Sequence, residues 1–218
     1  QVGRTLRVPE SYATIQVALD AAESGDMVVL ADGTYAGPGN REIAIPPKNL
    51  WIRSEYGPQA CIIDCSDADA GRYSGFTAIS EGSDVICEGI TFQHGEYHGF
   101  LVRNGRLRLI DCHATDFKYP CEGEGAVLAI EGCQFSGGDI GICVTACDVS
   151  IHDSGVVQNA MGMAVRSSQV VVTSTEIRQN TLCGLSIYSC FNTVFDHCLV
   201  SGNGRGSYGE QAIEFYNT

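Results

Sequence analysis

The sequence predicts an all-β fold, a single-stranded right-handed parallel β-helix (solenoid) with a short N-terminal capping α-helix. The first observation behind this prediction is that apolar residues recur in aligned columns from Val85 onward, about 21 residues apart. The second is that glycine is abundant at 26 residues and proline sparse at 6, which suits many short strands joined by tight turns. The third is that helical periodicity is confined to residues 14–22. We therefore expect one β-helix domain over residues 1–218, with clear coils over residues 85–218.

The capping helix is expected over residues 14–22. Its apolar residues have the i, i+3, i+4, i+7 spacing of one helix face, and they are Ile15, Ala18, Leu19 and Ala22. Thr14 is placed to cap the first turn, and Gly25 is placed to end the helix. The segment Met27–Leu30 is expected to be the first buried strand, followed by a turn at Asp32-Gly33. Further strands are expected at Ile43–Ile45, Leu50–Ile52 and Cys61–Ile63.

The repeat that begins at Val85 predicts the inward faces of the coils. Its first column is Val85, Leu107, Leu128, Val149, Val170 and Thr193. The second column shares that face because side chains alternate along a strand, and it is Cys87, Leu109, Ile130, Ile151, Val172 and Phe195. A two-residue break then predicts a corner, after which two more inward columns follow. They are Ile90, Cys112, Cys133, Ser154, Thr175 and Cys198, and then Phe92, Ala114, Phe135, Val156, Ile177 and Val200.

Glycine and asparagine recur at the next corner, in the column Gly95, Phe117, Gly138, Asn159, Asn180 and Asn203. We expect this column to adopt left-handed backbone, which glycine and asparagine tolerate. We also expect its three asparagines to hydrogen-bond to one another along the axis, a structural role that requires no active site. A third strand follows in each coil, at Gly141–Val144, Gly162–Val165 and Gly184–Ile187.

The formal net charge of −13 restricts the partners of the chain. Because the basic residues are scattered, we expect no nucleic-acid partner. A polyuronate or a sulfated glycan would be repelled unless a cation such as calcium bridged it to the protein, whereas a neutral polysaccharide meets no such barrier. No apolar run approaches the roughly 20 residues of a membrane span, so no membrane insertion is expected.

The 11 cysteines do not have the paired CxxC spacing of a structural zinc site. Cys112, Cys133 and Cys198 share an inward column with Ile90, so they are expected to be small buried residues with free thiols.

The N-terminal segments Val8–Gln16 (VPESYATIQ) and Leu30–Tyr35 (LADGTY) resemble the start of pectate-lyase-like right-handed β-helix proteins. The stretch from Gly37 to Cys65, with Glu88–Phe92 (EGITF), resembles secreted or surface β-helix repeat proteins of environmental bacteria. Chondroitinase-B-type polysaccharide lyases begin with a similar helix and ADGTY strand. The resemblance therefore implies carbohydrate binding or processing at a secreted or cell-surface location. It transfers no catalytic residue, because the lysine, arginine and calcium-binding carboxylates of those lyases fall on no matching positions here.

Polar residues at the first corner of each coil form a candidate catalytic ladder: Glu88, Asp111, Glu131, His152, Asp153, Asp196 and His197. Neighbouring coils lie about 4.8 Å apart, so these carboxylates and imidazoles would act together as acid and base or hold a cation. His113 is the best single candidate for a general base, because it is expected to point outward close to Asp111 and Glu131. The alternative is that polar residues at a corner are simply solvated.

A basic cluster lies near these residues: Arg103, Arg106, Arg108 and Lys118. The resembling lyases use arginine or lysine as the base, with calcium neutralising the substrate carboxylate. The candidate catalytic set is therefore His113, Asp111, Arg108, Glu131, His152 and Asp153. Surface solubility explains the basic residues equally well.

Two segments are candidates for metal binding. Asp64, Asp67 and Asp69 have a D-x-x-D-x-D spacing that would ligate calcium through carboxylate oxygens, although the full EF-hand pattern is missing. His94 and His98, with Glu96 between them, form the second candidate. A solvated polar loop is the alternative at both places.

We expect a secreted or cell-surface protein that binds or modifies polysaccharide along one elongated face, with lyase or glycoside hydrolase activity left open. The rival hypothesis is a non-catalytic structural or adhesive module of a larger surface protein. The last strand, near Ala212–Phe215, is expected to belong to an incomplete coil whose exposed edge would permit self-association.

Overall fold

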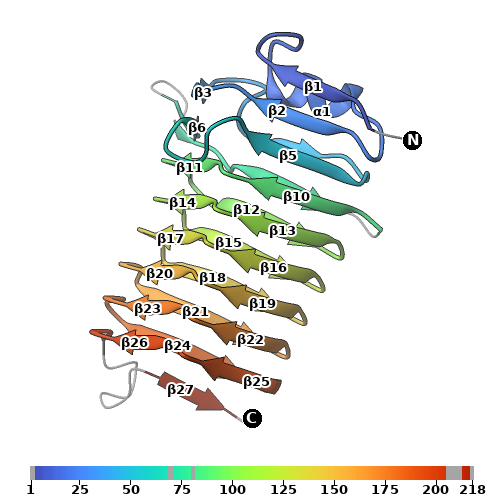
Figure 1. Ribbon diagram of the computed structural model, residues 1–218. Helices are drawn as coiled ribbons and strands as arrows, with labels where there is room; N and C mark the ends of the chain where they lie inside the picture. Colours follow the sequence, from blue (N-terminus) through green and yellow to red (C-terminus); the bar gives the residue numbers. More distant parts are fainter. Residues whose placement is uncertain (1–2, 68–70, 80–81, 205–212, 217–218) are drawn as a thin grey trace.

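The computed structural model describes residues 3–67, 71–79, 82–204 and 213–216 of the chain. These residues form a parallel solenoid whose coils stack from the N-terminus to the C-terminus (Figure 1). One short helix and three long parallel sheets account for its regular structure, together with a small antiparallel pair, β7 (Ser66–Asp67) and β8 (Gly71–Arg72). The prediction of an all-β parallel β-helix with one capping helix is confirmed.

The first sheet has nine strands in the order β1-β2-β5-β10-β13-β16-β19-β22-β25. Their bounds are β1 Thr5–Val8, β2 Met27–Leu30, β5 Leu50–Ser54, β10 Asp84–Glu88, β13 Arg106–Ile110, β16 Val127–Glu131, β19 Asp148–His152, β22 Gln169–Thr173 and β25 Phe191–Asp196. Strand β1 pairs with β2, with Leu6 and Val8 buried and Arg7 exposed between them. The expectation that Met27–Leu30 is the first strand is therefore wrong, because the short alternation in residues 5–8 already forms one.

The second and third sheets have eight strands each. The second comprises β3 Gly33–Ala36, β6 Cys61–Asp64, β11 Thr91–Gln93, β14 His113–Thr115, β17 Gln134–Ser136, β20 Gly155–Val157, β23 Glu176–Arg178 and β26 Leu199–Ser201. The third comprises β4 Ile43–Ile45, β9 Phe76–Ile79, β12 His98–Arg103, β15 Tyr119–Glu124, β18 Ile140–Thr145, β21 Met161–Arg166, β24 Cys183–Tyr188 and β27 Ile213–Tyr216. In a regular coil the chain passes through one strand of each sheet and turns three corners.

Helix α1 spans Ile15–Ala21 and packs against β1, β2 and β4 at the N-terminal end of the solenoid. The Thr14 side chain accepts a hydrogen bond from the Val17 amide at 3.4 Å, so the predicted N-cap is confirmed. The helix ends because Ala22 adopts extended backbone, before Gly25 is reached. The described part of the chain contains no helix of sufficient length and apolarity to cross a membrane.

The inward columns are stacked in the predicted register. Leu109, Ile130 and Ile151 are consecutive partners on β13, β16 and β19, and all three are buried in one core. The column of Phe92, Ala114 and Phe135 is aligned in the same way on the second sheet. Alternation along short parallel strands is what places these side chains inside.

The predicted left-handed column at the second corner is displaced by one residue. Positive φ occurs at the residue before each predicted one: His94, Asp116, Gly137, Gln158, Gln179 and Gly202. The asparagines instead turn inward, where Asn159 and Asn180 are buried. Asn159 Nδ2 donates to Asn180 Oδ1 at 3.2 Å, and Asn180 Nδ2 donates to Asn203 Oδ1 at 2.9 Å, so the predicted asparagine ladder is confirmed.

All 11 cysteines are free thiols. Cys112 and Cys133 are buried in the inward column as predicted, whereas Cys198 is half-buried. Burial raises the pKa of the Cys112 thiol well above its ordinary value, so this thiol is not a nucleophile at neutral pH.

Candidate functional site

The outward face of the first sheet carries a small aromatic and charged cluster on β5 and β10. Alternation along β5 buries Leu50 and Ile52 and turns Trp51 and Arg53 outward. Trp51 Nε1 donates to Glu88 Oε2 at 3.0 Å, and the Arg53 guanidinium carbon lies 5.7 Å from the centroid of the Trp51 ring. The indole is 39% exposed, so its ring remains available to a ligand on this face.

A hollow of about 320 Å³ lies beside this cluster, at the first corner, between the first and second sheets. Its lining residues are Arg53, Ser54, Gly57, Pro58, Glu88, Gly89, Asp111, His113 and Gly132. Glycine keeps the hollow open: a Cβ on Gly89 would lie 2.5 Å from Ser54 Oγ, and one on Gly132 would lie 2.2 Å from Asp111 Oδ1. Both glycines also have positive φ, at 68° and 65°.

His113 is the only imidazole lining this hollow. It is the first residue of β14 and is half-buried rather than fully outward. Burial lowers the pKa of its imidazole, and the nearby Asp111 carboxylate opposes this shift without reversing it. His113 is therefore neutral at pH 7 and able to accept a proton.

The structure brings together two of the six candidate catalytic residues, Asp111 and His113, in this hollow. Arg108 and Glu131 lie outside it. Arg108 Nη2 is 3.1 Å from Glu131 Oε2 across neighbouring strands β13 and β16, so each neutralises the other on the outward face of the first sheet.

His152 and Asp153 lie further along the solenoid, around the corner between β19 and β20. His152 Nδ1 is 2.8 Å from Thr173 Oγ1, and His152 Nε2 is 3.8 Å from Asp153 Oδ2. Neither residue lines the hollow at His113.

The predicted single ladder of corner residues is in fact two neighbouring columns. One column holds the last outward position of each first-sheet strand: Arg53, Glu88, Ile110, Glu131, His152, Thr173 and Asp196. The other holds the corner residue that follows, always with positive φ: Gly89, Asp111, Gly132, Asp153, Ser174 and His197. Asp111 and Asp153 therefore occupy positions at which the backbone itself favours glycine, asparagine or aspartate.

Asp64 is the one predicted calcium ligand whose side chain is described. Its Oδ1 accepts from the Ser66 amide at 2.9 Å, and its Oδ2 accepts from Gln93 Nε2 at 3.0 Å and lies 3.1 Å from His94 Nδ1. Asp69 lies outside the described residues, and Asp67 is described only as backbone in β7.

His94 and His98 contact carboxylates instead of each other. His94 Nε2 is 3.9 Å from Asp116 Oδ2, and His98 Nε2 is 2.6 Å from Glu122 Oε2. Within the described ranges, no three His, Cys, Asp or Glu side chains are grouped so as to hold a metal ion. Calcium binding stays a prediction.

Trp51 and Arg53 were not selected from the sequence as candidate site residues. The signal that would have found them is the Leu50-Trp51-Ile52-Arg53 alternation, which turns both side chains outward on a strand already expected. Arg53 reaches the hollow at His113 because β5 pairs with β10, and the aligned repeat begins only at Val85.

The profile of a protein family described as "Right handed beta helix region" matches residues 74–218. Among solved structures, pectate lyase Pel9A is 16% identical, with a TM-score of 0.53 over 86% of this chain and 68% of that one. A rhamnogalacturonan lyase is 15% identical, with a TM-score of 0.55 over 89% of this chain and 73% of that one. At such identities the likeness shows the fold alone.

One curated protein is related at low identity. It is described as a probable cytosol aminopeptidase of Synechococcus sp. (strain CC9605) and is 24% identical over 84% of this chain. The chain spans 43% of the length of that relative.

Proposed function

The chain belongs to the right-handed β-helix family, and from this premise we propose that it binds or modifies polysaccharide along the outward face of its first sheet. The single observation that carries the proposal is the hollow at the edge of that face, where His113, Asp111, Arg53 and Glu88 converge. An exposed indole beside a cleft with a few convergent polar groups is an arrangement suited to a sugar chain. The two lyases of similar fold, whose names refer to pectate and rhamnogalacturonan, support the same ligand class.

The chemistry that the hollow supports best is β-elimination from a uronate. Neutral His113 would remove the proton on the carbon next to the carboxyl group, while the Arg53 guanidinium balances the charge that develops on the carboxylate. The electron pair of the broken C–H bond forms the new C=C bond, and the glycosidic C–O bond breaks. The imidazolium of His113 then returns its proton to the leaving oxygen.

Charge determines which polysaccharides reach this face. With a net charge of −13, the protein repels a polyanion except near Arg53, so a calcium ion would be needed to bring a polyuronate close. A neutral polysaccharide requires no bridging cation. We place the protein outside the cell or at its surface, where burial of most of its thiols would limit their oxidation.

A non-catalytic adhesive or structural module is the second candidate, and one observation favours it. Asp111 lies at a corner with φ of 48°, where aspartate has a backbone role, and Arg108 and Glu131 neutralise each other. Such a face would bind a sugar chain without cleaving it.

A glycan panel with and without calcium, read by the fluorescence of the single tryptophan, tests binding at Trp51. Ultraviolet absorbance of unsaturated products from polyuronates tests the elimination. We expect His113→Ala and His113→Gln to lower turnover by about 10²- to 10⁴-fold while Trp51 still reports binding. His152→Ala is the matched control and should retain full turnover, because His152 lies outside the hollow.

Three outcomes separate the candidates. If the unmodified protein turns over a polyuronate and the His113 variants lose this turnover, the elimination is supported. If the unmodified protein binds a glycan at Trp51 but shows no turnover, the non-catalytic adhesive module is supported instead. A panel in which no glycan alters Trp51 fluorescence overturns the proposal of polysaccharide on this face.

A further inference from the structure

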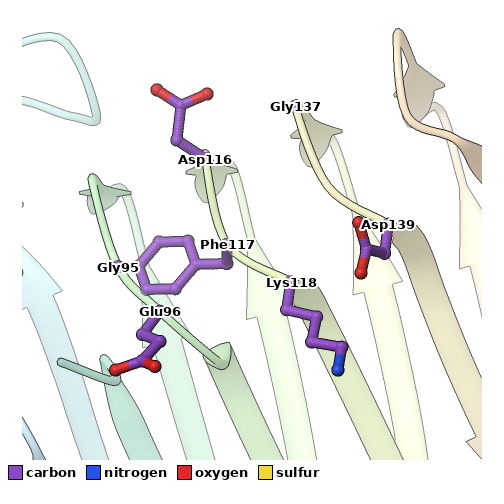
Figure 2. A pocket seen from close by; sticks show the side chains of 7 residues that line it. All are labelled: Gly95, Glu96, Asp116, Phe117, Lys118, Gly137 and Asp139. Atoms are coloured by element: carbon purple, nitrogen blue, oxygen red, sulfur yellow. The ribbon is translucent and has the colours of Figure 1, made fainter. Parts of the chain in front are cut away.

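A second and larger hollow lies at the second corner, between the second and third sheets. It has a volume of about 540 Å³ and is lined by Gly95, Glu96, Asp116, Phe117, Lys118, Gly137 and Asp139 (Figure 2). Neither the proposed reaction nor the asparagine ladder uses these residues. Its position around the solenoid differs from that of the His113 hollow, with which it shares no lining residue.

The hollow lies on the coils that precede the asparagine ladder. Phe117 occupies the ladder column, and its neighbours in that column are Gly95 and Gly138. Phe117 is buried against Gly95, where a Cβ would lie 1.7 Å from the phenylalanine ring. The sequence therefore replaces three stacked polar side chains with one buried ring and two glycines, which leaves open space outside them.

Lys118 is the cation of this hollow and one of only two lysines in the chain. Its Nζ lies 6.0 Å from the centroid of the Tyr97 ring and 5.5 Å from that of Tyr119. Among the described residues it forms no ion pair, although Glu96 and Asp139 line the same hollow (Figure 2). Lys48, in contrast, donates to the Ala22 carbonyl at 2.6 Å behind α1.

A row of aromatic rings adjoins Lys118 at the start of β12 and β15. Tyr97 is 49% exposed, and its ring centroid lies 6.1 Å from that of His98. The His98 ring is stacked on Tyr119 at 5.9 Å with an interplanar angle of 23°. His98 Nε2 lies 2.6 Å from Glu122 Oε2, and both side chains are largely buried.

We propose that this second corner binds one neutral sugar residue of a polysaccharide, as a site separate from the first-sheet face. The apolar face of a sugar ring would pack on Tyr97 and Tyr119, Lys118 would donate to its oxygens, and Glu96 and Asp139 would accept from its hydroxyls. The lining offers three carboxylates and one ammonium group, so an anionic sugar is repelled. The ligand class rests on the proposed function, while the location and the neutral charge are new.

Amine acylation with an N-hydroxysuccinimide ester, followed by mass spectrometry, tests this site directly. The probes are linear neutral hexasaccharides of glucose, mannose, xylose and galactose, with a galacturonate hexasaccharide as the anionic comparison. We expect at least one neutral probe to slow acylation of Lys118 by about tenfold, with the galacturonate probe giving no protection. Lys48 is the internal control, because its amine is engaged behind α1 and its acylation rate should not change.

Tyr97→Ala and Tyr119→Leu should each lower the affinity for the protecting probe about tenfold, since each removes part of the stacking surface. Tyr188→Ala is the matched control: Tyr188 is also an exposed tyrosine beside a cation, with the Arg166 guanidinium carbon 5.7 Å from its ring, but on a distant coil. Thermal unfolding of each variant verifies that the fold is retained. Protection that survives both tyrosine variants overturns the site.

Trp51 fluorescence distinguishes this site from the first-sheet face. If neutral probes alter Trp51 fluorescence but none of them protects Lys118, the second site is overturned and the proposed function stays intact. A neutral probe that protects Lys118 without altering Trp51 fluorescence supports a second site that is separate from the first-sheet face. Protection by galacturonate but by none of the neutral probes overturns the inference of a neutral sugar.

Discussion

The early coils, which we define as residues 50–139, and the late coils, residues 148–203, share the same inward columns but differ at their corners. Both hollows described above are lined by residues of the early coils. The late coils instead bury a polar ladder at the second corner, with Asn180 fully enclosed. The inside of each coil is constrained by stacking, so sites for ligands arise where corner residues depart from the repeat.

The interiors of the two regions also differ: the early interior is rich in aromatic rings, and the late interior contains buried polar residues. In the early coils the Phe92 ring lies 4.7 Å from both Phe76 and Phe100, in edge-to-face contacts. The late coils use smaller inward residues, among them Ser154 and Thr175, whose hydroxyls join hydrogen bonds between coils. Aromatic rings therefore pack the early interior, whereas buried hydroxyl groups link neighbouring coils in the late interior.

The largest expected effect is the loss of stability caused by a substitution in the asparagine ladder of the late coils. Asn180→Ala removes the acceptor for the Asn159 amide at 2.9 Å and the donor to the Val156 carbonyl at 3.1 Å, all in buried surroundings. Buried groups left without partners cost about 1–3 kcal/mol each, so we expect the free energy of unfolding to fall by about 3 kcal/mol. Urea and thermal unfolding measure this loss.

Thr181→Ala is the matched control for the ladder, because Thr181 is the next residue and is exposed. It should change the free energy of unfolding by less than about 0.5 kcal/mol. Equal losses in the two variants would mean that the ladder contributes nothing special to the late coils.

An intermediate effect is expected in the pH dependence of stability, which should differ between an early-coil variant and a late-coil variant. Burial raises the pKa of Asp64, but hydrogen bonds from Ser66, Gln93 and His94 outweigh burial and lower it to about 2. A carboxyl group with a lowered pKa in the folded state stabilises the fold above about pH 4, and this stability is lost as the pH falls towards 2. Asp64→Asn should therefore cost at most about 2 kcal/mol at pH 6 and almost nothing at pH 2.

Urea unfolding at pH 6, 4 and 2.5 measures this difference between the unmodified protein and Asp64→Asn. The loss caused by Asn180→Ala should stay constant over the same range, because the ladder holds no titrating group. If the Asp64→Asn difference is the same at pH 2.5 as at pH 6, the charge of Asp64 does not stabilise the early coils.

The interior of this fold is predictable from sequence because alternation alone decides which side chains point inward. Leu109, Ile130 and Ile151 needed no knowledge of neighbouring loops to be placed correctly. The predicted left-handed position at the second corner lies one residue after the observed one, because the buried asparagines resemble turn residues in composition but are held by ladder hydrogen bonds. Glycine and asparagine therefore predict that a corner is present, but they do not determine which of its residues has positive φ.

The candidate site was less predictable, because it depends on contacts between coils of unequal length. Asp111 and His113 are close in sequence, and their shared hollow follows from that spacing. Arg53 reaches the same hollow only because β5 stacks directly beside β10, across an irregular segment that no repeat describes. Sequence spacing likewise gave no sign that Arg108 would pair with Glu131 instead of pointing into the hollow.

The smallest expected effect concerns Asp153, a candidate catalytic residue that the structure places at a corner of the late coils. Its φ of 48° matches the corner positions where the early coils carry Gly89 and Gly132. Asp153→Gly should therefore change the free energy of unfolding by less than about 0.5 kcal/mol and leave turnover unaltered. Asp153→Val should cost about 1–3 kcal/mol, because a β-branched residue is strained at positive φ. Thermal unfolding and product absorbance measure both quantities, and loss of turnover in Asp153→Gly at an unchanged melting temperature would extend the active site into the late coils.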